Sequence, residues 1–203
     1  MQLTTVIVTR NKSASVKTLH TLLKLNIFCL ENSVQNRIIF TNDDHDSRQV
    51  ALKKNLKNTD RVLWIDYGIN IDEESLRQVI AKDWKWHGVV FPCVIEGINW
   101  EQFKENIDTS EPLSQKGLSF DTSVTTCVRD SFYKIDKTKP RCFCFDTKPF
   151  LKHVKKEKMS DFEHILSSNF NLVAYTNAKL IVTYPHECLG HILSAAGVKA
   201  NKA

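Results

Sequence analysis

The chain has 203 residues, of which 42% are hydrophobic and 25% are charged, and its formal net charge is +5. This length and balance are typical of one globular domain with a sizeable core, and they argue against long low-complexity linkers. We expect a single domain over residues 1–203 with an ordered core at about residues 3–193, either as a whole protein or as one module of a longer one.

The mild positive charge suits a protein that handles anionic small molecules. A nucleic-acid binder would carry a denser basic stripe with interleaved aromatic residues, so we predict no nucleic-acid partner. No segment approaches the roughly 18–20 apolar residues of a membrane span, and the N-terminus lacks the apolar core of a signal peptide. The six cysteines are therefore predicted to be reduced thiols in a cytoplasmic protein.

Apolar and β-branched runs alternate with helical patterns through the first half of the chain. The runs predict strands at Thr4–Thr9, Arg37–Thr41, Arg61–Ile65 and Gly88–Val94. The intervening segments predict helices at about Val16–Leu30, Ser47–Asn58 and Asp72–Ile80, with Asp72 as N-cap of the third. In the first helix, the residues at helical spacing are Val16, Leu19, Leu22, Leu23 and Leu30.

After residue 100 the pattern is looser. Helices are predicted at Trp100–Ile107, Met159–Ser168 and Cys188–Ala196, and strands at Leu118–Val128, Arg141–Phe145, Leu172–Tyr175 and Lys179–Tyr184. The alternation as a whole predicts an α/β fold, a Rossmann-like mixed but mainly parallel sheet flanked by helices.

Polar residues follow each of the first three predicted strands. They are Thr9 to Lys12, then Asn42 to Asp44, then Asp66 to Gly68. Ligands of open α/β sheets bind beyond the carboxyl ends of the strands, and this set of cations, acids and an aromatic ring suits a nucleotide. Neither a Gly-x-Gly-x-x-Gly run nor a Walker-type loop follows the first strand, which weakens a dinucleotide or ATP interpretation.

The order of the three motifs "TVIVTRNK", "FTNDD" and "VLWIDYG" resembles the A-type glycosyltransferases, in particular small single-domain members from large DNA viruses and phages. The stretches Val89–Trp100 and Val182–Ile192 add to the resemblance. It implies an enzyme that moves a sugar from a nucleotide-diphosphate-sugar donor to a hydroxyl acceptor such as a glycan. For a viral protein, the location would be the host cytoplasm.

The resemblance also implies a Mn²⁺ or Mg²⁺ site, because the family carries Asp-x-Asp at the end of the third strand. Here Asp66 matches the first acid, and Gly68 replaces the second. Asp72 could reach back, although a helix cap is its simpler role, and His186 lies where a late histidine of the family completes the metal site. Basic side chains such as Arg10 and Lys12 are the third alternative.

By the same resemblance, Thr9, Arg10, Asp43 and Asp66 would contact the nucleotide. Asp146, after the short apolar strand, would be the base that deprotonates the acceptor hydroxyl, with Glu96 as a rival, and a base favours inversion at the sugar carbon. The sequence Asp-Thr-Lys-Pro at this point is also good turn chemistry. Asp121 is a candidate for the acceptor pocket.

Two other functions stay open. The chain could be a non-catalytic domain of the same fold that binds a nucleotide sugar, a glycan or a partner protein, and Gly68 favours this alternative. A nucleotidyltransferase would share the fold but would want a basic, glycine-rich loop near the first strand. A zinc site made by Cys142, Cys144, His186 and Cys188 is disfavoured by its unusual spacing.

Overall fold

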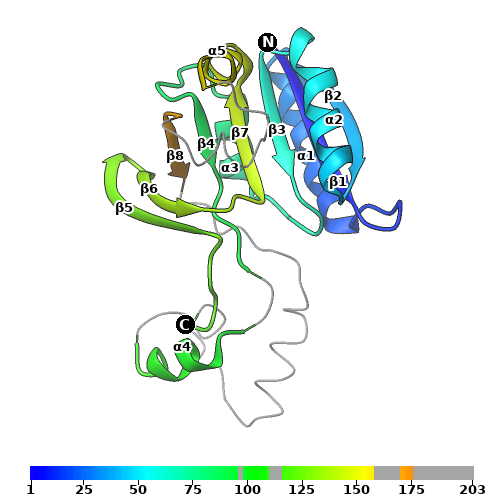
Figure 1. The fold of residues 1–203 in the computed structure, drawn as a ribbon. Coiled ribbons are helices and arrows are strands. Elements are labelled where there is room, and N and C mark those ends of the chain that lie inside the picture. The colour runs from blue at the N-terminus through cyan, green and yellow to red at the C-terminus, as the bar shows by residue number, and fades with distance from the viewer. Residues whose placement is uncertain (96–97, 110–115, 158–169, 176–203) are drawn as a thin grey trace.

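The computed structural model describes residues 1–95, 98–109, 116–157 and 170–175 (Figure 1). Its strands are β1 (Gln2–Thr9), β2 (Gln35–Asn42), β3 (Arg61–Ile65), β4 (Gly88–Val90), β5 (Thr122–Arg129), β6 (Phe132–Thr138), β7 (Cys142–Asp146) and β8 (Leu172–Tyr175). Its helices are α1 (Val16–Glu31), α2 (His45–Asn55), the 3₁₀ turn η1 (Leu56–Asn58), α3 (Glu73–Ile80), α4 (Trp100–Glu105) and α5 (Thr147–Glu157).

All eight strands form one sheet in the order β2-β1-β3-β7-β4-β8-β6-β5. The pairs β1–β2, β1–β3 and β4–β8 are parallel, whereas β7 is antiparallel to both of its neighbours and β6 to both of its own. Only β6 and β7 therefore run against the other six strands. The predicted α/β fold with a mixed sheet flanked by helices is confirmed, and six of its eight strands share one direction although four of the seven pairings are antiparallel.

Helices cover both faces of the sheet. On one face α1 and α3 pack on a core that includes Leu25, Leu63 and Leu76. On the other face α2 and α5 pack on a second core that includes Leu52, Trp64 and Phe150. Because β3 is covered on both faces, all five of its residues are buried, which explains the continuous apolar run of residues 62–65 after Arg61.

The strand order reverses direction at β1. From β1 the chain crosses to β2 on one side and then returns to β3 on the other, so a topological switch point lies between β1 and β3. The carboxyl ends of these three strands point to the lower edge of the sheet in Figure 1. Crevices at switch points are where open α/β sheets bind their ligands.

Several predicted elements match the structure closely. The bounds of β3 and β8 are as predicted, and Asp72 caps α3 by accepting a 3.0 Å hydrogen bond from the Ser75 amide. The cap role of Asp72 is thereby confirmed. The predicted helix at Met159–Ser168 and the two elements after Lys179 lie outside the described residues.

Three features differ from the sequence-based expectation. The segment after Asp146 begins helix α5 instead of a turn, and β6 forms an antiparallel hairpin with β5 that the sequence pattern did not indicate. In α1, Leu22 is buried, but Val16, Leu19, Leu23 and Leu30 are exposed. Within the described residues, no helix is long and apolar enough to cross a membrane.

Candidate functional site

A tight turn follows β1 and fixes the position of Arg10. Arg10 and Ser13 exchange two backbone hydrogen bonds of 3.1 and 2.9 Å, and the two residues between them, Asn11 and Lys12, both have positive φ. Two positive-φ residues in a two-residue loop define a type I′ turn. Before it, the Thr9 hydroxyl donates to the Thr41 carbonyl at 2.9 Å, which ties the ends of β1 and β2 together.

Asp43, which directly follows β2, lies between two arginines. Arg10 Nε donates to one carboxylate oxygen at 2.8 Å, and Arg48 Nη2 donates to the other at 2.5 Å. Arg48 comes from the first half of α2, which Asp44 caps through the Ser47 amide. The cap therefore sets the helical turn that brings Arg48 back over the strand ends.

Asp66, the first residue after β3, is buried and has three partners. Its Oδ1 accepts from Trp64 Nε1 at 2.8 Å, and its Oδ2 lies 3.3 Å from Arg48 Nη2 and 4.0 Å from Arg141 Nε. The backbone carbonyl of Arg141 also accepts a 2.8 Å hydrogen bond from the Asp66 amide. Asp66 is thus held by the end of its own strand and by the start of the antiparallel strand β7.

The two carboxylates have opposite pKa shifts. Burial raises the pKa of the Asp66 carboxyl, against the opposing effects of Arg48, the Trp64 indole and Arg141. At Asp43 partial burial acts in the raising direction, but the hydrogen bonds and charges of Arg10 and Arg48 outweigh it and lower the pKa. A buried acid with a raised pKa at a strand end is typical of a functional site.

Gly68 lies in a tight turn that starts at Asp66. The Ile69 amide donates to the Asp66 carbonyl at 3.4 Å, and Gly68, at the third position of this turn, has a φ of 82°. Turns of type II require a positive φ at this position and favour glycine there. The backbone therefore favours glycine at position 68, where the resemblance would place the second acid of an Asp-x-Asp motif.

The described residues do not fit a divalent cation at Asp66. Mn²⁺ and Mg²⁺ prefer oxygen ligands, but the Asp66 and Asp43 carboxylates both form ion pairs with guanidinium groups. Arg48 Nη2 lies between the two carboxylates, in the position that a cation bridging them would take. Among the described residues no group of three or more His, Cys, Asp or Glu side chains could hold a metal, and His186 lies outside them.

Asp146 does not lie beside Asp43 and Asp66. Because β7 is antiparallel to β3, Asp146 pairs with Arg61, the first residue of β3, whereas Ile65 pairs with Cys142. Asp146 is therefore at the amino end of β3, the opposite edge of the sheet, where it forms a 2.8 Å ion pair with Arg61. The structure therefore does not bring Asp146, the expected base for the acceptor hydroxyl, together with Asp43 and Asp66, and its catalytic role stays a prediction.

The remaining candidates have other surroundings. Asp121 accepts hydrogen bonds from the Cys93 amide, the Arg141 amide and the Thr122 hydroxyl, so it links the exit of β4 to the entry of β7. Burial raises the pKa of its carboxyl. Glu96 lies outside the described residues. Cys142 and Cys144 are buried in the core as small apolar side chains.

Sequence reasoning missed three members of the site: Arg48, Trp64 and Arg141. Arg48 lies in a mainly polar helix, so nothing in the sequence distinguished it from solvent-exposed cations. Arg141 reaches Asp66 only because β7 pairs antiparallel with β3, and this pairing has no local sequence signal. The cation–π contact between Arg10 and Tyr67, at 5.2 Å, was also not visible from the sequence.

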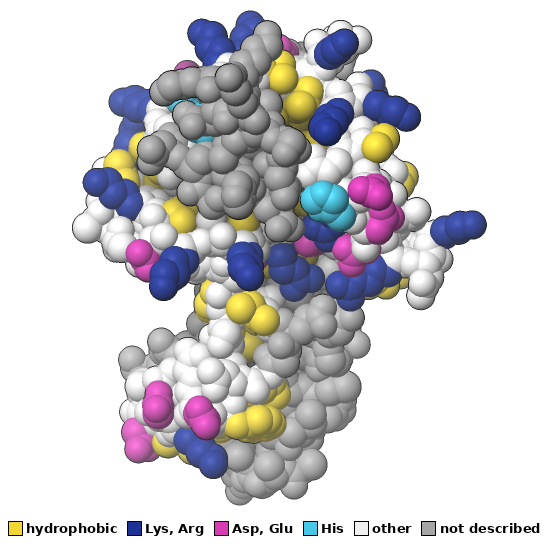
Figure 2. Space-filling view, viewed as in Figure 1, with side chains coloured by type: hydrophobic (Ala, Val, Ile, Leu, Met, Phe, Trp, Pro, Cys, Tyr) yellow, Lys and Arg dark blue, Asp and Glu magenta, His cyan; other side chains and the backbone are white. Residues whose placement is uncertain are grey.

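The surface at this edge is rich in positive charge. In Figure 2, Lys and Arg side chains form a row along the lower edge of the sheet-containing body, above α4, with acidic side chains near both ends. Three guanidinium groups, those of Arg10, Arg48 and Arg141, face two carboxylates within the site. With all five groups ionised, the cluster carries a net positive charge that suits an anionic ligand.

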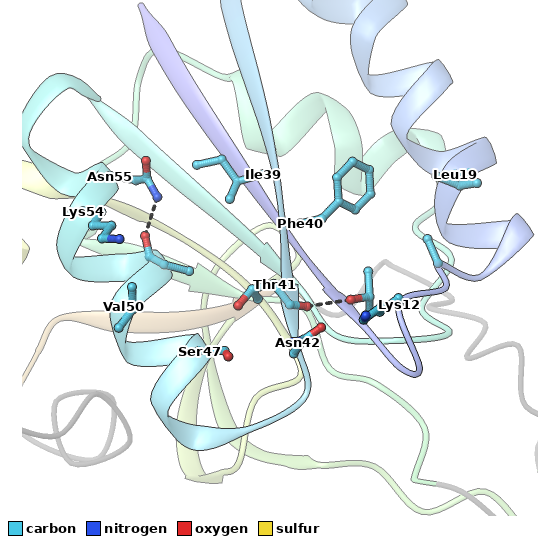
Figure 3. Close-up of a pocket in the computed structure, with 13 residues that line it drawn as sticks. Lys12, Leu19, Ile39, Phe40, Thr41, Asn42, Ser47, Val50, Lys54 and Asn55 are labelled. Atoms are coloured by element: carbon cyan, nitrogen blue, oxygen red, sulfur yellow. Dashed lines mark hydrogen bonds between the residues drawn. The ribbon is translucent and has the colours of Figure 1, made fainter.

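A hollow of about 740 Å³ borders this site along the edge strand β2 (Figure 3). Thr9, Asn42 and Ser47 line its end near Asp43. Phe40 points toward Leu19 of α1, whereas Val50 comes from α2 on the other side of the strand. Neither Asp43 nor Asp66 lines the hollow, so it adjoins the charged cluster without containing it.

No protein-family model and no curated protein matches the chain. Among solved structures, HddC from Yersinia pseudotuberculosis aligns with a TM-score of 0.47 at 8% identity over 92% of this chain and 96% of that one. The inositol-1-phosphate CTP transferase from T. maritima aligns with a TM-score of 0.43 at 8% identity, over 98% of both chains. S. aureus TarS 1-349 aligns with a TM-score of 0.44 at 13% identity, over 100% of this chain and 67% of that one. These are similarities of chain path and assign no residue a role.

Proposed function

We propose that the chain is a transferase that binds a nucleotide-diphosphate-sugar donor at the ends of β1, β2 and β3 and moves the sugar to a hydroxyl acceptor. The observation that carries this proposal is the cluster of Arg10, Arg48 and Arg141 around Asp43 and Asp66 at the switch point. The motif order of the first three strands, which resembles that of A-type glycosyltransferases, supports the same function.

The arginines would bind the donor's diphosphate. A guanidinium presents five N–H donors in a planar fork that matches phosphate oxygens. Both ion pairs of Arg48 use the same nitrogen, Nη2. The N–H groups on Nε and Nη1 of Arg48 take no part in these two ion pairs. In the reaction, negative charge develops on the departing nucleoside diphosphate, and fixed cations stabilise that charge without reorganising.

Asp43 and Asp66 would hold the arginines in position. The Asp43 carboxylate fixes Arg10 and Arg48 relative to each other, and the buried Asp66 accepts from Trp64 while facing Arg48 and Arg141. Arginine side chains lose considerable rotamer entropy when they bind a ligand, and prior pairing reduces that loss. No step of this proposal passes through a divalent cation.

Calorimetric binding of a panel of nucleoside diphosphates, with EDTA and then with Mn²⁺, tests the proposal. We expect binding in EDTA, weakened about 10- to 100-fold by Arg48→Met, as for the loss of a hydrogen bond to a charged group. Lys53→Met, which removes an exposed cation of the same helix, is the matched control and should bind as the wild type does. The proposal fails if no nucleoside diphosphate binds or if Arg48→Met binds normally.

A second candidate, a non-catalytic domain that binds the same ligands, is favoured by the position of Asp146. The base expected from the sequence is at the opposite edge of the sheet, paired with Arg61. Incubation with nucleotide sugars distinguishes the two candidates. Release of nucleoside diphosphate in the presence of an acceptor indicates a transferase, and binding without turnover indicates a binding domain.

A further inference from the structure

Helix α1 is apolar on two opposite faces. One face packs on the sheet through Leu22, Leu25, Phe28 and Cys29. The opposite face carries a second apolar row, formed by Val16, Leu19, Leu23, Ile27 and Leu30, which we call the outer stripe. Val16 and Leu30 are each 80% exposed and Leu23 is 64% exposed, so the sheet does not cover this row.

The outer stripe is a continuous line along the helix. At 100° per residue, its five members fall within an arc of about 80°, roughly opposite the centre of the buried face. Scattered exposed apolar residues are normal on protein surfaces, but an aligned, contiguous row indicates an interaction surface. Phe40 on the edge strand β2 is also exposed and points toward Leu19 (Figure 3), which widens the apolar surface beside the helix.

We propose that the outer stripe is the interface of a homodimer, in which α1 packs antiparallel on α1 of a second copy around a two-fold axis at Leu23. The observation that selects a second copy is the symmetry of the spacing. Leu19 and Ile27 are each four residues from Leu23, and Val16 and Leu30 are each seven residues from it. A two-fold axis requires one surface to complement itself, and the spacing of this apolar row is the same in both directions.

In this arrangement every stripe residue meets an apolar partner. Leu23 packs on Leu23 of the partner subunit, Leu19 faces the partner's Ile27, and Val16 faces the partner's Leu30. One pair of flanking charges is complementary, because Lys17 lies near the end of the helix that the partner's Glu31 approaches. Antiparallel packing also opposes the two helix dipoles, with the positive end of one helix beside the negative end of the other.

The size of the surface predicts a dimer of moderate strength. A 16-residue helix is about 24 Å long and about 10–12 Å wide with its side chains, and the β2 edge beside it adds a strip of similar length. A standard interface buries roughly 800 Å² on each partner. The outer stripe with Phe40 is smaller than this value, so we expect a dimer that dissociates on dilution.

Analytical ultracentrifugation of the full chain over a dilution series, with charge variants at position 23, tests the proposal. The wild type should sediment as a dimer at high concentration, while Leu23→Glu and Leu23→Lys should each be monomeric, because like charges meet at the axis. An equimolar mixture of the two variants should recover the dimer, because opposite charges then meet. Val128→Glu, at an exposed apolar residue of β5, is the matched control and should remain dimeric.

Three results would overturn the proposal: a monomeric wild type at every concentration, a dimeric Leu23→Glu, or a mixture that stays monomeric. Leu23 is exposed, so its variants should keep the thermal stability of the monomer fold, and circular dichroism checks this. The dimer is independent of the nucleotide site. Normal nucleotide binding by monomeric Leu23→Glu would separate the two proposals.

Discussion

Arg61 and Asp146 form a 2.8 Å ion pair that joins the first residue of β3 to the last residue of β7. The Arg61 side chain is 5% exposed and has further partners. Its Nη1 donates to the carbonyls of Val79 and Ala81 at the end of α3, and its guanidinium lies 3.6 Å from the centre of the Trp84 ring. One buried cation therefore connects two strands, a helix end and an aromatic side chain.

Replacing Arg61 by alanine should be strongly destabilising. The change leaves a partly buried carboxylate and two carbonyls without their donor, and breaking a buried ion pair in this way typically costs about 3–5 kcal/mol. Urea denaturation monitored by circular dichroism measures the free energy of unfolding. Asp146→Asn, which keeps an oxygen to accept from Arg61, should cost less. A loss below about 1 kcal/mol in Arg61→Ala would contradict the buried network.

Gly88 at the start of β4 allows close approach of its neighbours. A Cβ at this position would lie 2.9 Å from the Cys144 carbonyl oxygen and 2.7 Å from Leu172 Cδ2. Gly88→Ala should therefore destabilise the fold by about 1–3 kcal/mol, the usual cost of overpacking. Urea denaturation, with Thr126→Ser on the exposed hairpin as control, measures this. A neutral Gly88→Ala would contradict the pairing of β4 between β7 and β8.

Gly68 provides a test of the turn that follows Asp66. Its φ of 82° disfavours residues with a side chain, so Gly68→Ala should cost about 1–2 kcal/mol, and Gly68→Asn less, because asparagine tolerates positive φ. Gly68→Asp creates an Asp-x-Asp sequence at residues 66–68 but leaves Arg48 between Asp43 and Asp66. We expect Gly68→Asp to gain no Mn²⁺ affinity by calorimetry, and a gain of tight binding would show that the arginines do not exclude the ion.

The sequence allowed the strand ends to be predicted more reliably than the contacts among them. The β3 segment was recognised because burial on both faces requires continuous apolar residues, and the acid after it marked Asp66. The partners of Asp66 could not be predicted in the same way. Arg48 is brought back by a capped helical turn, and Arg141 by an antiparallel pairing, and neither has a distinctive residue pattern.

Two further features could not be predicted, because neither strand direction nor the buried face of a helix has a local sequence signal. Asp146 ends an apolar strand as Asp66 does, but β7 runs opposite to β3, so its carboxyl end lies at the other edge of the sheet. In α1, the sequence showed apolar residues at helical spacing but not that they form rows on two opposite faces of the helix. Periodicity shows that a row exists, and tertiary packing determines which row is buried.

The opposite pKa shifts of Asp43 and Asp66 predict opposite effects of acid on their contributions to stability. The pKa of Asp43 is lowered in the fold, so its contribution is present above the unfolded value of about 4 and is lost as the pH falls through the folded pKa. The pKa of Asp66 is raised, so the folded state binds its proton more readily, and acidification through that pKa favours folding at this residue.

Denaturant titrations of the wild type, Asp43→Asn and Asp66→Asn across the acidic range measure these contributions. The stability difference between the wild type and Asp43→Asn should shrink as the pH falls below about 4, because both proteins then carry a neutral side chain at position 43. The difference between the wild type and Asp66→Asn should change in the opposite direction, in favour of the wild type, and should begin at a higher pH. Parallel curves for the two variants would show that the arginine cluster does not separate the two carboxylates, and the assignment of Asp66 as the buried acid of the site would then be wrong.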